Sequence, residues 1–372
     1  MQLRSGPLKG VRVVEMAGLG PAPFSAMHLA DLGAEVVRVA RPGQKYPFPI
    51  KEKFNIYDRS RRSVVLDLQT DDGQAALWQL LERAEILIEG FRPGVMEKLG
   101  FGPDEVLGRS PALVYGRMTG WGQTGPLAQA AGHDLNYAAL SGAIWSVGDA
   151  DAPPTVPLNV VGDLAGGAMM LSVGVLAALT HARATGQGQV VDTAMTDGSA
   201  LMMAMQYGFL SAGFWNDNER GSNFLNGGMA WYGCYETLDR QYVALGCLEP
   251  QFYAEFLERM GLTNDPVFKD QYTSTTQTLK KERLTEVFAS KTRDEWCAIL
   301  EGTDACFAPV LSMSEAPDHP QNKARCTFVD VDGVIQPAPA PRFSRTPAAP
   351  PTAAGAREMT VTEILSYWSV AS

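Results

Sequence analysis

Cysteine and histidine are both scarce in this chain of 372 residues, with five cysteines and four histidines. No two cysteines have the CxxC spacing that zinc sites and redox motifs use. An odd cysteine count also argues against a disulfide framework. We therefore expect no metal site and a reducing, cytoplasmic compartment. The first residues lack the apolar run of a signal peptide, which agrees with that expectation.

The chain also lacks an excess of basic residues and long apolar runs. Its net charge is −10, whereas nucleic-acid binders usually carry a basic surface, so we expect no nucleic-acid partner. The longest uncharged run that could be mistaken for a membrane span is Leu164 to Thr180, which contains three glycines. A spanning helix needs about 20 apolar residues. We therefore expect a buried core helix here and no membrane association.

Short apolar runs and amphipathic segments alternate through the first half of the chain. This rhythm predicts an α/β fold in which a mainly parallel, Rossmann-like sheet carries helices on both faces. The expected strands are 11–16, 35–39, 63–68, 85–88, 112–117 and 189–194, and the expected helices are 23–32, 73–83, 133–147, one beginning near 160, and 197–212.

The second half changes character after a polar, turn-rich segment. We expect a large α/β domain over 1–213, a linker over 214–228, a smaller α+β domain over 229–330 and a carboxy-terminal strap over 331–372. In the small domain we expect strands at 232–237 and 241–246, with helices beginning at 250, 280 and 293. The Pro/Ala-rich stretch 336–353 is interrupted by groups that can dock, which favours an ordered strap over a disordered linker. We expect a last helix near 360–368.

The first loop is not a complete dinucleotide-binding motif. Only two glycines of GxGxxG are present, because Pro23 occupies the place of the third. The acidic residue that binds a ribose hydroxyl is replaced by Arg38 and Arg41, which argues against NAD. Arginine at this position suits a nucleotide with an extra ribose phosphate, such as NADP or coenzyme A. The alternative is that both arginines are solvated surface residues.

His133 and Asp163 are candidate acid–base groups. His133 opens a predicted helix in GHDLNY, where the positive end of the helix dipole favours the neutral imidazole that a general base needs. Asp163 opens the long apolar helix in VVGDLAGG, where glycines let a ligand approach closely. Glu249 precedes a helix in LEPQFY and could orient a histidine. Each of the three could instead be an ordinary helix-capping residue.

Several methionines are predicted near the long apolar helix. A methionine-rich wall can adapt to acyl chains of different shape, although the same residues could simply belong to the core. They are Met169, Met170, Met195, Met202, Met203 and Met205.

Long segments of the chain resemble the family III CoA-transferase (CaiB/BaiF) superfamily, and within it the α-methylacyl-CoA racemase branch. The resemblance covers nearly the whole chain. Its most specific segments are RMTGWGQTGP and GHDLNY, supported by LKGVRVVEMAGLGPAPF, IEGFRPGVMEKLGFGPDE, PLNVVGDLAGGAMM, GQGQVVDTAMTDG, LEPQFY and APRFSRT.

The resemblance implies roles for individual residues. His133 and Asp163 match the catalytic histidine and aspartate of the racemases, and Glu249 matches the carboxylate that accompanies the histidine. Lys98 stands where an arginine is expected and Gln69 where a lysine can occur, which weakens those two contacts. With Arg38 added from the nucleotide argument, the expected CoA contacts are Arg38, Arg41, Leu66, Asp67, Leu68, Gln69, Gly90, Phe91, Arg92, Lys98, Gly132, Asp134, Leu135, Asn136 and Tyr137.

The resemblance also implies an assembly and an activity. The family fold is an interlocked homodimer, in which Glu249 would come from the second chain. The implied activity is that of an isomerase that exchanges the α-proton of 2-methylacyl-CoA thioesters, with CoA as part of the substrate and no separate cofactor. One alternative is a CoA-transferase that uses Asp163 as its nucleophile, and another is an acyl-CoA-binding protein without catalysis.

Overall fold

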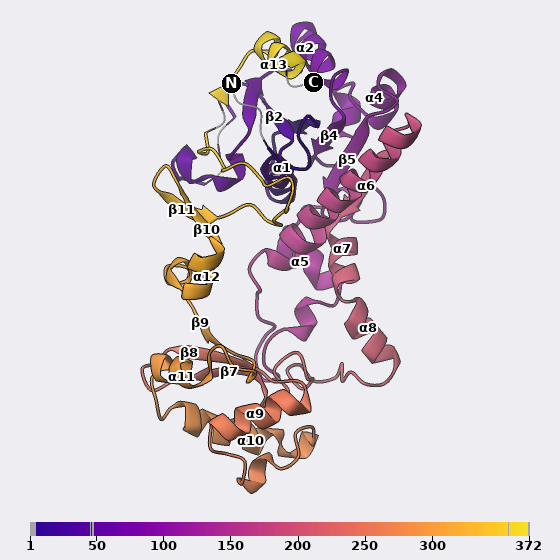
Figure 1. The fold of residues 1–372 in the computed structure, drawn as a ribbon. Coiled ribbons are helices and arrows are strands. Elements are labelled where there is room, and N and C mark those ends of the chain that lie inside the picture. The colour runs from indigo at the N-terminus through magenta and orange to yellow at the C-terminus, as the bar shows by residue number, and fades with distance from the viewer. Residues whose placement is uncertain (1–4, 45, 47, 356, 371–372) are drawn as a thin grey trace. The chain divides into compact units, whose positions relative to one another are not determined.

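The chain folds into two compact units in the computed structural model, which describes residues 5–44, 46, 48–355 and 357–370 (Figure 1). Unit 1 comprises the described residues up to Ala143, Pro157–Ala204 and the described residues from Ala324 onward. Unit 2 comprises Ile144–Val156 and Met205–Lys323.

Unit 1 is built on a parallel sheet of seven strands, which confirms the expected α/β class. Hydrophobic side chains alternate between its two faces, as the period of a strand requires. Val14 of the first strand pairs with Val37 on one side and with Leu87 on the other. The strand order is β12 (Arg357–Glu358), β3 (Arg62–Val65), β2 (Glu35–Ala40), β1 (Arg12–Met16), β4 (Ile86–Glu89), β5 (Val114–Thr119) and β6 (Val190–Ala194).

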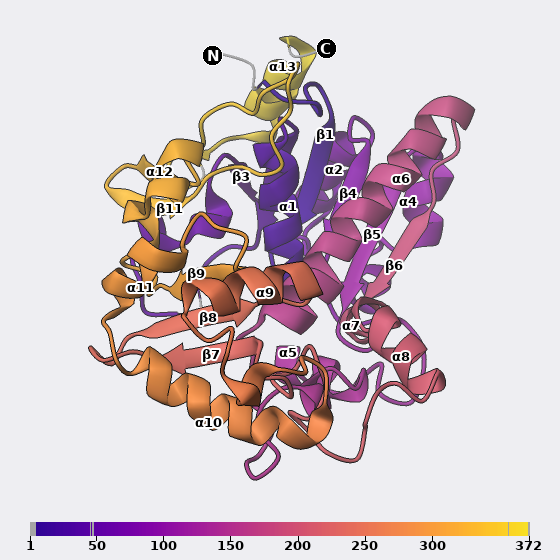
Figure 2. The same cartoon turned by 60° about the horizontal axis from the view of Figure 1, so that its bottom comes forward.

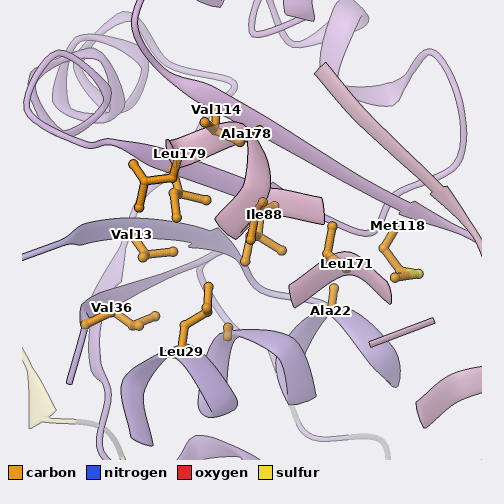
Figure 3. Close-up of a cluster of buried hydrophobic side chains, with 14 of the residues drawn as sticks. Val13, Ala22, Leu29, Val36, Ile88, Val114, Met118, Leu171, Ala178 and Leu179 are labelled. Atoms are coloured by element: carbon orange, nitrogen blue, oxygen red, sulfur yellow. The ribbon is translucent and has the colours of Figure 1, made fainter. Parts of the chain in front are cut away.

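Helices cover both faces of this sheet. The helices α1 (Pro21–Asp31) and α6 (Met170–Thr185) lie on one face of the sheet (Figure 2). The core on this face packs Val13 and Ile88 against them (Figure 3). The opposite core packs Leu87 and its neighbours against α2 (Asp71–Leu81) and α13 (Val361–Val370). The other helices of unit 1 are α3 (Val95–Lys98), α4 (Pro103–Arg109), α5 (Asp134–Leu140) and α7 (Met195–Met202).

A π-helical segment, Val160–Met169, leads directly into α6. Its glycines allow α7 to pack closely, since a methyl group at Gly166 would lie 2.6 Å from the backbone nitrogen of Ser199. The continuous helix Val160–Thr185 is long and apolar enough to cross a membrane by composition. Within unit 1 it packs along β5 and β6, with Leu171 and Val175 fully buried.

Two expected helices are shorter than the sequence predicts. The helix expected over 133–147 ends at Leu140, because Gly142 takes a left-handed conformation with φ of 81°. The helix expected over 197–212 is divided at Met203 into α7 and α8 (Ala204–Ser211). Apolar periodicity alone does not reveal such interruptions.

Unit 2 contains an antiparallel sheet of β7 (Tyr232–Glu236), β8 (Tyr242–Gly246) and β9 (Phe307–Val310). The first two strands were expected and β9 was not. Its FAPV sequence includes Pro309, and a proline argues against a strand except at a sheet edge, which is where β9 lies. The α-helices of this unit include nearly all of α8, α9 (Pro250–Arg259), α10 (Gln277–Phe288), α11 (Arg293–Leu300) and the first four residues of α12 (Pro320–Arg325).

The unit boundaries differ from the expected domain boundaries. Segment 144–156 groups with unit 2 because Trp145 donates a hydrogen bond to the Asp217 carbonyl at 3.0 Å and Arg220 donates one to the Ala152 carbonyl at 2.8 Å. Segment 205–213 also belongs to unit 2. The expected boundary at 330 falls inside β10 (Phe328–Val331), which pairs with β11 (Val334–Pro337) in unit 1.

The carboxy-terminal strap, from β11 onward, contacts other parts of unit 1. The Arg59 guanidinium donates to the Gln336 side chain at 2.9 Å and the Pro337 carbonyl at 2.7 Å. Farther along, β12 adds to the sheet beside β3, and the Tyr367 hydroxyl donates to Glu35 at 2.9 Å. These contacts order the carboxy-terminal segment.

Candidate active site

A cavity of about 560 Å³ opens at the carboxyl ends of the parallel strands of unit 1. It is lined by the loops that follow β1, β4 and β5, together with the start of α5 and the π-helical segment. The strand order reverses between β1 and β4, and ligands of open α/β sheets bind at such a switch point. The fold therefore places this cavity where a small-molecule site is expected.

Asp163 projects into this cavity from the first turn of the π-helical segment. Its backbone N–H donates to Asp134 Oδ1 at 2.6 Å, and its carboxylate accepts a hydrogen bond from Asn159 at 3.2 Å. Burial raises the pKa of the Asp163 carboxyl above its ordinary value, and the Asp134 charge raises it further. The Asn159 hydrogen bond and the His133 charge lower it. The balance favours the protonated carboxyl more than in water.

His133 enters the same cavity from the residue that precedes α5. Its backbone N–H donates to the Asn136 side chain at 3.0 Å, and this contact fixes the start of the helix. The imidazole is exposed to the cavity. The chain thus brings one imidazole and one carboxyl group, distant in sequence, to a single cavity. Such a pair can donate and accept protons on a bound molecule.

Glycines bring the backbone close to the Asp163 carboxyl group and to Tyr137. Gly20 has φ of 71°, and a methyl group there would lie 3.5 Å from Asp163 Oδ2. The Tyr137 ring packs edge-on against the Trp121 ring, with 4.7 Å between the ring centroids. The Tyr137 hydroxyl donates a hydrogen bond to the Gly132 carbonyl. A methyl group at Gly132 would be 2.7 Å from this ring, which explains the glycine in GHDLNY.

The structure brings only part of the expected CoA-binding set to the cavity. Those that line it are Arg38, Gly90, Phe91, Arg92, Gly132 and Tyr137, besides the two acid–base groups. Those outside the lining are Arg41, Leu66, Asp67, Leu68, Gln69, Lys98, Asp134, Leu135 and Asn136. Most of the latter are solvent-exposed, whereas Leu66 and Asp134 are buried, with 9% and 6% of their surface exposed.

A buried ionic network fixes one wall of the cavity. Arg61 is ion-paired with both Glu15 and Asp58, and Arg38 lies 3.8 Å from Asp58. Burial raises the pKa of Glu15, and the Arg61 charge opposes that shift. Because Arg38 and Asp58 both line the cavity, the network holds a guanidinium at its rim.

A second network supports the loop after β4, which carries Arg92. The Glu89 carboxylate accepts a hydrogen bond from the Phe91 backbone at 2.7 Å and another from Arg117 at 2.8 Å. Arg117 also pairs with Glu97 at the end of α3. These bonds fix the turn that presents the exposed Arg92 to the cavity.

Glu249 and most of the methionines lie apart from this cavity lining. Glu249 belongs to unit 2, where it is exposed and precedes α9. Met195 lines the cavity. Met169, Met202 and Met205 are exposed, which argues against the alternative that all six methionines form core.

The cavity residues that the sequence did not predict include Tyr57, Asp58, Trp121 and Asn159. The sequence could have indicated Asn159, because it precedes Asp163 by four residues, a spacing that brings two side chains of a helix into contact. No sequence pattern indicated Tyr57, because it reaches the cavity from the connection between β2 and β3. Burial and the Asp163 charge raise the pKa of Tyr57. Among the described residues, no cluster of three His, Cys, Asp or Glu side chains could hold a metal ion.

The model of the family "CoA-transferase family III" matches residues 8–356. The chain belongs to this family. As a family III protein it is 43% identical to the α-methylacyl-CoA racemase of Mus musculus, a match that covers 92% of this chain and 88% of the relative. It is 42% identical to the human racemase over the same shares. The crystal structure of a CaiB/BaiF family protein from Brucella suis superposes with a TM-score of 0.82 at 24% identity, covering 98% of this chain and 100% of that one.

Proposed function

We propose that this chain is a 2-methylacyl-CoA racemase, an isomerase that interconverts (R)- and (S)-2-methylacyl-CoA thioesters. The observation that carries the proposal is that His133 and Asp163 line one cavity. The identity to the mouse and human racemases supports the same reaction. The acyl-CoA is the substrate, and no separate cofactor is needed.

The reaction follows from the acidity of the carbon next to a thioester. One base removes the α-proton on one face, and the electron pair moves into the carbonyl to give an enolate. The acid on the opposite face then returns a proton to the same carbon, which inverts the centre. His133 and Asp163 take these two roles and exchange them according to the hand of the substrate. Backbone N–H groups at a helix N-terminus lining the cavity stabilise the enolate oxygen.

The raised pKa of Asp163 suits this chemistry. A carboxyl group that gives a proton to an enolate must be protonated for part of the time near neutral pH. Burial in the cavity wall raises the pKa of Asp163 in that direction. Arg38 and Arg92 at the cavity supply positive charge for the phosphates of CoA.

The test is exchange of the α-hydrogen in heavy water, measured on each enantiomer by mass spectrometry. The wild-type protein should exchange both enantiomers without any added acid. His133→Ala should lose exchange from one enantiomer more than from the other, and Asp163→Ala should show the opposite bias. Equal and slight losses from both enantiomers would contradict the two-base scheme.

The second candidate is a CoA-transferase with Asp163 as nucleophile, which the family model also covers. It requires an acceptor acid and passes through an anhydride at Asp163 that hydroxylamine traps. His133 at the cavity favours the racemase, because a nucleophilic transfer does not need a second base there. A protein that only binds acyl-CoA would show neither exchange nor trapping.

The proposal includes an interlocked homodimer in which Glu249 of the partner subunit orients His133. The exposure of Glu249 before α9 supports a role at a contact between chains. Mixing His133→Ala with Glu249→Ala subunits tests this. If Glu249 acts across the dimer, one of the two sites regains both wild-type residues and activity returns. If both residues come from the same chain, every site keeps one lesion.

A further inference from the structure

Asp134 is a buried acidic residue directly behind the candidate active site. Its side chain was expected to contact CoA, but it lies outside the cavity lining and only 6% of its surface is exposed. Oδ1 accepts the hydrogen bond from the backbone of Asp163 at 2.6 Å. Oδ2 is buried and has no hydrogen-bond partner among the described residues.

The neighbouring backbone is shaped to admit this carboxylate. Residue 162 is glycine, and a methyl group there would lie 2.7 Å from Asp134 Oδ1 and 2.9 Å from the Asp134 carbonyl oxygen. The N–H of Asp163 lies in the first turn of the π-helical segment, where backbone donors lack an intrahelical partner. Asp134 satisfies one of them from another helix.

We propose that Asp134 is a positioning residue for Asp163, whose buried carboxylate fixes the Asp163 backbone and supplies a negative charge behind its carboxyl group. The inference rests on the proposed function, because it assigns Asp134 a part in proton exchange. Asp134 does not touch the reacting carbon. It acts through Asp163, whose geometry and proton affinity it controls.

The negative charge of Asp134 favours the protonated form of Asp163, which is the form that can return a proton to an enolate. A negative charge held close to a second carboxyl group favours the protonated form of that group. The Asp134 charge raises the pKa of Asp163, and the Asn159 hydrogen bond lowers it. The two neighbours therefore act on the same carboxyl group in opposite directions.

Other ionisable groups near Asp163 are few. His133 precedes α5 and lowers the pKa of Asp163, while Tyr57 and Tyr137 each feel the Asp163 charge. The ionisable groups on the other helices packed against the segment are His28, Asp31, His181, Arg183 and Asp197, and none of these contributes to the shift at Asp163.

The experiment compares two substitutions with opposite expected signs. Asp134→Asn keeps an oxygen that can accept the Asp163 N–H but removes the charge. The limb of the pH–rate profile of α-deuterium exchange that reports Asp163 should move to lower pH by about half a unit to one unit, with kcat reduced several-fold and KM within twofold. Asn159→Ala removes the hydrogen bond to the same carboxyl and should move that limb to higher pH.

An Asp134→Asn profile that superimposes on wild type would overturn the proposal. So would a rise in KM at unchanged kcat, which indicates a CoA contact instead. If Asp134→Asn does not fold, Asp134→Ser takes its place, because serine is a neutral residue that also accepts a capping hydrogen bond.

A second readout does not depend on activity. The carboxyl band of Asp163, obtained as the infrared difference between wild type and Asp163→Asn, should titrate at lower pH in the Asp134→Asn background. If the wild-type protein exchanged no α-hydrogen, the proposed function would fail, and this titration would still decide whether Asp134 controls Asp163. An unchanged titration would refute the control by Asp134.

Discussion

Gly162 and Asp134 fit against each other so closely that a side chain at residue 162 has no room. A methyl group at Gly162 would lie 2.7 Å from Asp134 Oδ1. Asp134 Oδ1 also accepts a hydrogen bond, at 2.6 Å, from the backbone N–H of Asp163, the residue after Gly162. The contact joins α5, which His133 precedes, to the π-helical segment that carries the candidate acid.

Gly162→Ala should therefore lower exchange activity by about ten- to hundredfold while the fold is retained, because a displacement of about 1 Å at a catalytic group has effects of that size. Deuterium exchange measures the rate and circular dichroism checks the fold. The matched control is Gly108→Ala in α4, where a methyl group would meet nothing within 4 Å. A Gly162→Ala protein as active as this control would show that the contact is unimportant.

Asp163→Asn should stabilise the protein near neutral pH. The folded-state pKa of Asp163 is raised above its ordinary value of 3.8, so the ionised carboxylate costs folding free energy at pH values above the folded pKa. Below pH 3.8 the group is protonated in both states and the cost disappears. The gain in Tm over wild type should be present at pH 7 and vanish at low pH. Thermal unfolding across this range measures it, and an equal gain at every pH would contradict the electrostatic origin.

Arg61→Leu should destabilise the protein by about 3–5 kcal/mol, because it leaves the buried Glu15 carboxylate without its ion-pair partner and removes one of the two arginines beside Asp58. The side chains of Arg61 and Glu15 are both 0% exposed. Urea unfolding measures the loss. Arg183→Ala is the control in the same unit, since its pair with Glu85 is largely exposed and should be worth only about 0–1 kcal/mol. Replacing Glu15 and Arg61 together by leucine should recover part of the stability.

Arg92→Ala should raise KM for acyl-CoA by about tenfold with little change in kcat, because a phosphate contact binds substrate and transition state alike. Arg92 is exposed at the cavity, on the turn that Glu89 and Arg117 hold. Added salt should weaken the difference between variant and wild type. Arg83→Ala, an exposed arginine after α2, is the charge-matched control. A large loss of kcat at unchanged KM would place Arg92 in the chemistry instead.

Part of the fold could be read from the sequence because strands and helices bury apolar residues at different periods. The short apolar runs that contain Val13, Val14 and the matching residues of neighbouring strands predict a buried parallel sheet. The structure confirms this sheet. The edge strand β9 was missed because Pro309 hides its pattern, and the ends of α5 and α7 were missed because local backbone turns decide them.

The sequence by itself determined the two acid–base candidates, His133 and Asp163, because each lies in a distinctive segment at the start of a helix. Only the tertiary structure decided that they share a cavity and that the Asp134 carboxylate accepts a hydrogen bond from the Asp163 backbone. The same folding excluded Arg41 and Lys98 from the cavity lining and brought Tyr57 and Asn159 into it. The reason is physical: helical and strand periodicity is a local property of the chain, whereas a cavity forms where segments distant in sequence pack together.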